Sequence, residues 1–460
     1  MSRLYDLLPT FAQDLACSVV GYRNAQVRYS PHFHRVLSEW ERNLSASDAE
    51  LRAIQRDRLV RAVQRARTCV PFYRDLPPPS SARDPSEAIQ STLASIPPLD
   101  KGTYRAQPEA FLASDVPRSE LTRGRTSGTT GTALPLWHTR EAIAEEYATV
   151  WRMRRSCGVD LNAPHASFGG QIIVPFKQTG PPFWRVNHYG HQVLFSIYHM
   201  APQNLGAYVE AIHAANARYV QGYPSALHLI ARAMLERGHA FAPGQLAAVF
   251  TSSESLLAFH RETIEKAFGA PIWDRYGTSE FAVSMTACRE RRLHVDMEFC
   301  VVEVDVREET HEYQRGPLLV TGLSRDGAPF LRYRIGDVGT RLKRPCPCGR
   351  AGDVFLDLDG RIEDYVITPD GRPIGRLDHI FKEQLDVAEA QIRQETKDAI
   401  ELLVVPWSTY TPESERKLLR EVRSRLGDEL AVSIRIVEAI PRESNGKFRA
   451  VKSRIGRNAP

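Results

Sequence analysis

The spacing of apolar residues predicts an amphipathic helix in the first part of the chain, over residues 49–68. Apolar residues recur there near helical spacing among many charged ones. They are Leu51, Ile54, Leu59 and Val63. The arginines of this segment would also suit an RNA contact, but a solvated helix face explains them more simply. We therefore expect a surface helix.

A second pattern begins near residue 217, where short β-rich runs end in a turn and lead into helical segments. Residues 217–238, 246–269 and 270–280 follow this order, which is the rhythm of βα units in a parallel sheet. In such a sheet the functional loops lie at the carboxyl ends of the strands. Short alternating strands follow Arg289, so we expect a β-rich subdomain beside the α/β body.

The C-terminal part of the chain predicts a small α+β unit of its own. A strand over residues 400–406 is followed by a helix over 412–428 and by a second strand over 432–440. The charged, turn-rich segment 357–375 has the composition of a linker between this unit and the body.

The expected fold class is therefore α/β, in two domains of unequal size. A large N-terminal α/β body with a β-rich subdomain covers residues 1–362, and a small, mobile α+β domain covers residues 363–460.

Charge and composition narrow the class of protein only slightly. The formal net charge is +5, from 60 basic and 55 acidic residues, which gives no case for a nucleic-acid or membrane partner. Asp6 and Asp14 interrupt what would have to be the apolar core of a signal peptide, and no apolar run approaches the roughly 20 residues of a membrane span. Seven cysteines without regular spacing fit a reducing compartment. We expect a cytoplasmic protein without a membrane span. The sequence leaves open whether the protein forms a homodimer.

The run TSGTTG has the residue types of an anion-binding loop, because backbone N–H groups and hydroxyls can surround a phosphate. It is not the common nucleotide loop, since Gly131 is followed by Thr132 where that motif needs a lysine. The loop consists of Thr126, Ser127, Gly128, Thr129, Thr130 and Gly131.

Five motifs, taken in order, give the chain a resemblance to a known superfamily. They are TSGTTG, YGTSE at 276–280, RYRIGDVG at 332–339, GRIEDY at 360–365 and PRESNGKFRA at 441–450. This order resembles the adenylate-forming (acyl-CoA synthetase-like) superfamily.

The finer match is to its phenylacetate–CoA ligase-like branch, through CVPFYRDL at 69–76, IPPLDKGTYRAQPEAF at 96–111 and CPCGR at 346–350. The segment TPDGRPIGRLDHIFK at 368–382 is most similar to the polysaccharide-biosynthesis (CapK) and coenzyme F390 synthetase-like subset. The resemblance covers the chain from about residue 69 onward.

The resemblance implies an enzyme that joins a carboxylate to the α-phosphate of ATP and releases pyrophosphate. The loop 126–131 would hold the departing pyrophosphate through its many donors. In YGTSE, Tyr276 is similar to the residue that packs on adenine, and Gly277 and Thr278 continue the nucleotide turn. Ser279 corresponds to the hydroxyl near the α-phosphate and Glu280 to the ligand of Mg²⁺.

Other implied nucleotide contacts are spread along the chain. The Ser-rich turn of Ser252, Ser253 and Glu254 takes the place of the adenine-contacting turn. Asp337 resembles the carboxylate that accepts both ribose hydroxyls, and Arg361 resembles its partner on the ribose side.

The resemblance also implies a moving C-terminal domain. Lys447 resembles the mobile lysine that bridges the carboxylate and the α-phosphate during adenylation. The family pivots two residues after the conserved arginine, usually on an aspartate, whereas here that position is Glu363 with Asp364 next.

A cluster of cysteine and histidine residues forms a second kind of site. Cys346 and Cys348 lie close together, and Cys288 with His294 lies upstream, so the four could offer three thiolates and one imidazole to a structural zinc ion. The alternative is a set of buried free cysteines beside an unrelated histidine.

The acid pocket is placed by position in the family at Phe168, Gly169, Trp184 and Tyr223. Aromatic and glycine residues would suit a flat substrate, although they would equally suit core packing.

The leading hypothesis is an ATP- and Mg²⁺-dependent acid ligase that passes the acyl group to coenzyme A. A close alternative keeps the adenylation but transfers to an amine or hydroxyl in polysaccharide or secondary-metabolite assembly. A remote alternative is a non-catalytic nucleotide-binding paralogue. The partners are in each case small molecules: a carboxylic acid and an acyl acceptor.

Overall fold

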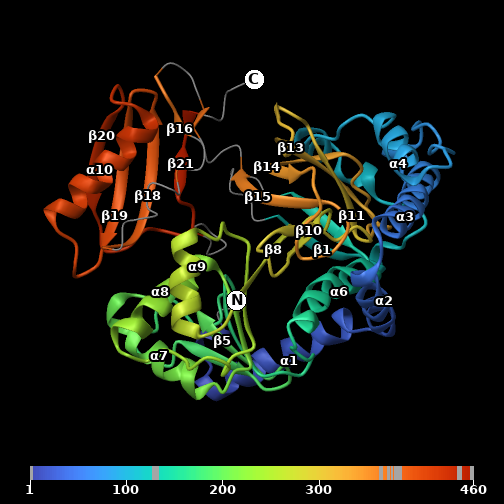
Figure 1. The fold of residues 1–460 in the computed structure, drawn as a ribbon. Helices are drawn as coiled ribbons and strands as arrows, with labels where there is room; N and C mark the ends of the chain where they lie inside the picture. The colour runs from blue at the N-terminus through green and yellow to red at the C-terminus, as the bar shows by residue number, and fades with distance from the viewer. Residues whose placement is uncertain are drawn as a thin grey trace.

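The structure, a computed structural model, describes residues 4–126, 134–361, 366–369, 373–374, 377, 386–442 and 448–455 (Figure 1). It consists of a large α/β body and a smaller C-terminal unit, which Figure 1 shows in red beside the body. The predicted α/β class, with a β-rich part and a small α+β unit, is confirmed.

The middle of the body is a parallel sheet, as the βα rhythm of the sequence predicts. Its strands run β8-β7-β6-β3-β5, and β4 closes one edge antiparallel to β5. The bounds are β3 His165–Gly169, β4 Trp184–Asn187, β5 Gln192–Ser196, β6 Tyr219–Gly222, β7 Ala248–Ser252 and β8 Ile272–Gly277.

The β-rich part is a wing of the same sheet and not a sheet of its own. Antiparallel pairing of β8 with β9 joins it to the parallel strands, and the order then continues β9-β10-β15-β14-β13-β11 in a sheet of 13 strands. The bounds are β9 Ser284–Ala287, β10 Leu293–Val295, β11 Cys300–Val304, β12 Glu308–Glu309, β13 Tyr313–Gly322, β14 Tyr333–Leu342 and β15 Val354–Arg361.

Helices cover the two faces of the parallel strands differently. On one face α7 Leu205–Ala214, α8 Pro224–Glu236 and α9 Ala258–Phe268 bury a continuous apolar core that includes Phe168 and Val249. On the other face lies α6, residues Arg140–Ser156. The remaining helices of the body are α1 Thr10–Arg28, α2 Pro31–Arg42, α3 Asp48–Cys69, α4 Pro85–Ala94 and α5 Lys101–Ala106.

The predicted helix over residues 49–68 is confirmed as α3. It begins with a capping box in which the Ser47 hydroxyl accepts from the Glu50 backbone N–H and the Glu50 carboxylate accepts from the Ser47 N–H. Three of the four apolar residues of the pattern, Leu51, Leu59 and Val63, are buried in the core of the body, whereas Ile54 is only partly buried.

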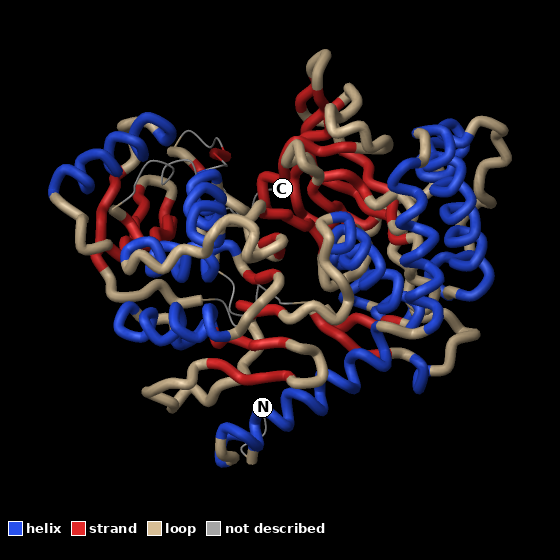
Figure 2. Tube along the Cα trace, turned by 60° about the horizontal axis from the view of Figure 1, so that its bottom comes forward, coloured by secondary structure: helices blue, strands red, loops and turns tan. Residues whose placement is uncertain are grey.

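The N-terminal helix α1 covers the exposed edge of the sheet at β4 (Figure 2). The Asp14 carboxylate accepts from the backbone N–H of Val186 at 2.8 Å, and the Ser18 hydroxyl accepts from that of His188 at 3.0 Å. Since residues four apart share one helix face, one turn of α1 satisfies two N–H groups that an edge strand leaves open. No helix in the described part of the chain is long and apolar enough to cross a bilayer.

The C-terminal unit has a four-stranded sheet, a helix and an apolar core of its own. The predicted strand, helix and strand are β19 Ala399–Pro406, α10 Pro412–Leu426 and β20 Ala431–Ile436. The helix stops two residues early because Gly427 has φ of 85°. The other strands are β16 Val366–Ile367, β17 Pro373–Ile374, β18 Val387–Thr396 and β21 Val451–Ser453.

A buried ion-pair network fixes α6 against the β-rich wing. The Arg152 guanidinium, 2% exposed, contacts Asp296 at 2.5 Å and Glu298 at 2.8 Å. Asp296 also contacts the Arg350 guanidinium at 3.1 Å and accepts from the Ser284 hydroxyl at 2.6 Å. Burial alone would raise the pKa of Asp296, but Arg152 and Arg350 lower it, so the carboxylate stays ionised.

We expect Arg152→Met to lower the free energy of unfolding by about 3–5 kcal/mol, because it leaves two buried carboxylates with too few cations. Urea unfolding followed by circular dichroism measures the loss. Arg155→Met is the matched control: Arg155 lies on the same helix but is half exposed, where an ion pair with Glu41 contributes about 0–1 kcal/mol. Equal losses in the two variants would contradict the role given to Arg152.

Candidate functional site

The predicted pyrophosphate loop is the connection of a β-hairpin. Strands β1 Thr122–Arg125 and β2 Pro135–His138 pair antiparallel. Thr126 closes the hairpin, because its backbone N–H donates to Leu134 O at 3.0 Å and its hydroxyl accepts from the Leu134 N–H at 2.9 Å. The predicted residues Ser127, Gly128, Thr129, Thr130 and Gly131 lie outside the described residues.

The carboxyl ends of four parallel strands bring further predicted residues to one edge of the sheet. Gly169 ends β3, Tyr223 follows β6, Ser252 ends β7, and Tyr276 and Gly277 end β8. β7 and β8 are neighbours in register, with Ser252 opposite Arg275. The position is the one where open α/β sheets bind ligands.

The predicted adenine and ribose contacts touch each other. The Tyr276 hydroxyl donates to the Asp337 carboxylate, although 61 residues separate them in the chain. Asp337, on β14, is also the cross-strand partner of Arg361 on β15. Asp337 thus lies next to both of the other residues that were assigned to the nucleoside.

The turn after Tyr276 contains a buried hydroxyl whose hydrogen bonds are not satisfied and a residue in the left-handed conformation. The Thr278 hydroxyl is buried without a hydrogen-bond partner, and Ser279 next to it is exposed. Glu280 is 7% exposed, and the Tyr333 hydroxyl lies 3.5 Å from its carboxylate. The chain then turns at Phe281 with φ of 52°, an unusual conformation for an aromatic residue.

Left-handed residues also mark two other predicted motifs. Ser253 has φ of 74° in the Ser-rich turn, and Arg332 has φ of 45° at the start of RYRIGDVG. Such conformations cost of order 1–3 kcal/mol and concentrate at binding sites. In the described part of the chain, three of the six non-glycine residues with positive φ therefore lie in or directly beside predicted nucleotide motifs.

His138 links the hairpin to the turn after Tyr276. Its ring packs on Phe281 at 4.2 Å, and its Nδ1 lies 3.3 Å from the Arg325 guanidinium. Burial lowers the pKa of His138 to about 3 and that of Arg325 to about 10. The imidazole is therefore neutral, and the hairpin base and the turn form one packed unit.

Glu254 contacts the C-terminal unit instead of lining the sheet edge. Its carboxylate accepts from the backbone N–H groups of Ser225 at 3.0 Å and Phe448 at 2.6 Å. Burial raises the pKa of Glu254. Phe448 directly follows Lys447, which lies outside the described residues, as do Glu363 and Asp364. The side chain of Arg361 is likewise not described.

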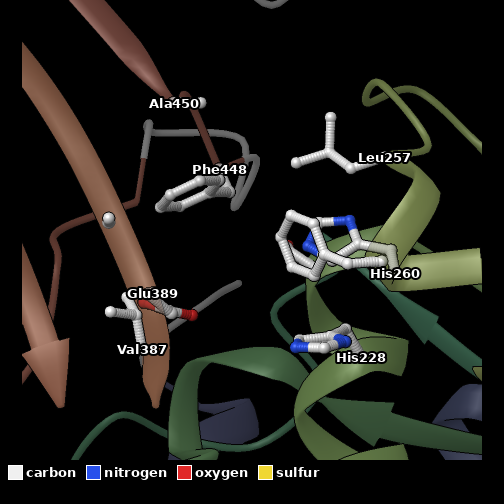
Figure 3. A pocket seen from close by; sticks show the side chains of 10 residues that line it. His228, Leu257, His260, Val387, Glu389, Phe448 and Ala450 are labelled. Atoms are coloured by element: carbon white, nitrogen blue, oxygen red, sulfur yellow. The ribbon is translucent and has the colours of Figure 1, made fainter. Parts of the chain in front are cut away.

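A small cavity of about 30 Å³ lies between the body and the C-terminal unit (Figure 3). His228 and His260 project into it from α8 and α9, while Glu389 and Phe448 face them from the C-terminal unit. Burial lowers the pKa of His260 to about 3 and also lowers that of His228 well below its usual value. The contact is therefore between neutral imidazoles and a surface that carries the Phe448 ring and the Glu389 carboxylate, which pairs with Arg442.

The structure brings the four predicted metal ligands together. The Sγ atoms of Cys288 and Cys346 are 3.7 Å apart, and Cys348 Sγ lies 3.3 Å from His294 Nε2. All four ligand atoms lie within 4.8 Å of one another. A tetrahedral site with Zn–S bonds of about 2.3 Å places two sulfur atoms about 3.8 Å apart, so the donor set fits zinc.

A cavity of about 1520 Å³ extends from the nucleotide edge of the sheet to α1. Of the predicted acid-pocket residues, Gly169 and Tyr223 line it. Phe168 borders it, but its ring stacks on Phe195 in the core at 4.6 Å. Trp184 packs against that core and does not line the cavity.

Sequence reasoning missed most of the cavity wall. Its floor is polar where a core would be apolar, because alternate residues of β3 and its neighbours point into it: His165, Ser167, Gln192 and Gln221. The alternation of polar and apolar residues in HASFG was a signal for a strand with two unlike faces.

Comparisons with known proteins agree with this geometry. Residues 366–454 match the family model described as the CapK C-terminal domain. Protein CapK of Staphylococcus aureus is 25% identical over 98% of both chains. A phenylacetate-coenzyme A ligase of Thermus thermophilus is 24% identical over 87% of this chain and 96% of its own.

Solved structures give the fold. The 2-hydroxyisobutyryl-CoA ligase in its postadenylation state, in complex with R3-HIB-AMP, has a TM-score of 0.68 at 20% identity and covers 90% of this chain and 91% of its own. The same ligase in the thioesterification state has a TM-score of 0.54. The chain is therefore similar to protein CapK along almost its whole length, and it has the fold of the 2-hydroxyisobutyryl-CoA ligase.

Proposed function

We propose that the protein is an ATP-dependent carboxylic acid ligase that forms an acyl-adenylate, releases pyrophosphate and transfers the acyl group to coenzyme A. The observation that carries this proposal is the contact of Tyr276 with Asp337 at the edge of the sheet where the large cavity begins. A nucleoside bound there has its phosphates beside a space large enough for an acid.

Hydrogen-bond donors and acceptors around this edge suit the parts of ATP. Asp337 accepts from the ribose hydroxyls and Arg361 flanks them from the neighbouring strand. The buried Thr278 hydroxyl, which has no hydrogen-bond partner among the described residues, and the loop 126–131 are the donors that we propose for the phosphates. The turn of Ser252 and Ser253 lies beside the base.

Glu280 is the residue that would hold Mg²⁺. A carboxylate with little solvent exposure, at the turn that also carries Thr278 and Ser279, is the hard oxygen ligand this ion prefers. The ion would neutralise charge on the phosphate oxygens as pyrophosphate leaves.

In this proposal the C-terminal unit supplies the catalytic lysine, Lys447. We assign residues 363–460 to a domain that pivots at Glu363 and Asp364 and brings Lys447 to the α-phosphate and the acid carboxylate. The contact of Phe448 with Glu254 supports this assignment, because it holds the residue after Lys447 against the turn of the nucleotide edge.

The acceptor follows from the relatives. The ligase with the similar fold has been solved with 2-HIB-AMP and CoA, and the relative from Thermus thermophilus is a coenzyme A ligase. Coenzyme A is therefore the acceptor we propose, while an amine or hydroxyl acceptor stays the alternative.

The proposal predicts ATP–pyrophosphate exchange that depends on added carboxylic acid. We expect Lys447→Ala to lower exchange by about 10²-fold or more, because it removes a cation from the developing charge, while ATP binding measured by calorimetry stays within about threefold. Lys397→Ala, in an exposed turn of the C-terminal unit, is the matched control and keeps full exchange.

Exchange that is absent across aryl, aliphatic and amino acids would rule out the proposed reaction, and unchanged exchange in Lys447→Ala would remove that lysine from it. The amount of free coenzyme A thiol then separates the two acceptors: consumption of the thiol supports the ligase, and its persistence supports an amine or hydroxyl.

We further propose that Cys288, His294, Cys346 and Cys348 hold a structural zinc ion. Their four ligand atoms fill a tetrahedral site, which leaves no position for a substrate. The role is to fix the β9–β10 hairpin to the segment between β14 and β15.

Purified protein should contain about one zinc ion per chain by plasma mass spectrometry. Cys346→Ser should lose the metal and unfold at lower temperature, because the remaining ligands hold zinc weakly. The control is Cys157→Ser, which changes a partly buried cysteine at the end of α6 and keeps the metal. A stable wild-type protein without zinc would refute the site.

A further inference from the structure

The large cavity has a floor of hydrogen-bonded polar side chains. Cα partners in a parallel pair point to the same face, so His165 faces the cavity with Gln192, and Ser167 faces it with Gln221. Their neighbours Ala166 and Val220 point to the opposite face and pack in the core with α7, α8 and α9. The polar residues are therefore confined to the face that a ligand would touch.

These side chains form one chain of hydrogen bonds whose direction is fixed at both ends. At one end the Gly190 backbone N–H donates to Asn187 Oδ1 at 3.1 Å, so the Asn187 Nδ2 group donates onward to Gln192 Oε1 at 3.1 Å. At the other end the Arg154 guanidinium donates to Gln221 Oε1. A backbone N–H and a guanidinium can only donate, so neither glutamine amide can be turned around.

Both amides consequently point their Nε2 groups at Ser167. Gln192 donates to its Oγ at 2.7 Å and Gln221 at 2.8 Å. A serine hydroxyl has two acceptor lone pairs and one O–H, so both lone pairs are used and the O–H is left to donate. The floor of the cavity therefore presents a hydrogen-bond donor to a ligand.

Arg154 adds a charge to this donor surface. Its guanidinium carbon lies 4.8 Å from the ring centroid of Trp151, 5.2 Å from that of Tyr219 and 5.6 Å from that of Phe250. These rings fix the orientation of the guanidinium plane. Its Nε is buried without a hydrogen-bond partner. Among the described residues, no carboxylate forms an ion pair with Arg154.

The charges that line the cavity do not balance. They are Arg28, Arg154, Arg275 and Glu146. Arg275 and Glu146 pair at 2.6 Å, while Arg28 lies over the Tyr147 ring at 4.4 Å. Within the described chain Arg28, like Arg154, has no carboxylate partner, so the wall has an excess of two positive charges that a ligand can neutralise.

We propose that the cavity binds an acid with a second carboxylate and that Arg154 is the residue that recognises it. The inference rests on the proposed adenylation, in which the first carboxylate reacts at the nucleotide edge. A guanidinium that lines the cavity without a carboxylate partner among the described residues, beside a donating hydroxyl, is complementary to a carboxylate, which only accepts. The rings around Arg154 flank the body of the same acid.

The strand geometry gives the spacing of the two carboxylates. Arg154 contacts Tyr219 and Gln221, which lie four and two residues before Tyr223 at the nucleotide end of β6. At about 3.3 Å per residue, the second carboxylate binds about 7–13 Å from that end. Diacids of at least the length of adipate or of 4-carboxyphenylacetate reach this far.

The experiment compares acids that differ by one carboxylate, using pyrophosphate exchange with hexanoate against adipate and phenylacetate against 4-carboxyphenylacetate. In the wild type we expect kcat/KM to favour the diacid of a pair by about tenfold or more. Arg154→Met should abolish this preference by raising KM for the diacid with little change in kcat, since the contact lies away from the reacting carboxylate.

A second variant guards against a folding defect in Arg154→Met. Gln221→Glu keeps the side-chain shape and places a carboxylate beside Arg154, so it should also abolish the preference for the diacid. Arg155→Met removes a charge from the same helix outside the cavity and should keep the wild-type preference. Circular dichroism melting confirms that each variant is folded.

The outcomes separate the inference from the function on which it rests. Exchange with monoacids that equals exchange with diacids in the wild type, or an unchanged preference in both Arg154→Met and Gln221→Glu, overturns the role of Arg154 and leaves adenylation intact. The lack of exchange with every acid overturns the proposed function itself.

Discussion

The buried carboxylate of Asp296 holds the body of this protein together. It lies in the loop after β10, fully removed from water, where an isolated ion would be too costly to keep. Arg152 from α6 and Arg350 from the segment before β15 compensate it, and Ser284 adds a hydroxyl. One charge therefore fixes a helix, a hairpin and a long loop relative to each other.

The position of the candidate sites depends on this arrangement. Arg350 is two residues from Cys348, so the pairing that compensates Asp296 also orients the proposed metal ligands. Arg152 is two residues from Arg154, and residues two apart on a helix point to different sides. Because α6 is anchored through one side, the other side presents Arg154 to the cavity in a fixed position.

The sequence predicted elements and local motifs well where a single segment carries the signal. The strand, helix and strand of the C-terminal unit and the helix α3 agree with their apolar spacing to within a few residues. The resemblance also led to Tyr276 and Asp337, which the structure brings into contact. It assigned Glu254 to adenine, a role that stays a prediction, while the structure shows it at the C-terminal unit.

The sequence could not predict the tertiary environment of individual side chains, and the arginines of α6 show why. Arg152, Arg154 and Arg155 follow one another almost directly, yet one is buried in an ion network, one lines the cavity and one pairs at the surface. Their residue type is identical, so only the rotation of the helix against the sheet distinguishes them. Phe168 and Trp184 were expected in the pocket from their position in the family, whereas the structure packs their aromatic rings in or against the core.

The helix α1, which covers β4 through Asp14 and Ser18, also forms the far wall of the cavity at Cys17 and Gly21. This wall lies outside every motif of the nucleotide edge. On the proposed function, mutations in the first thirty or so residues can therefore reshape one wall of the cavity while the residues proposed to bind ATP stay unchanged. A lineage could then alter the shape of this space without changing the nucleotide motifs.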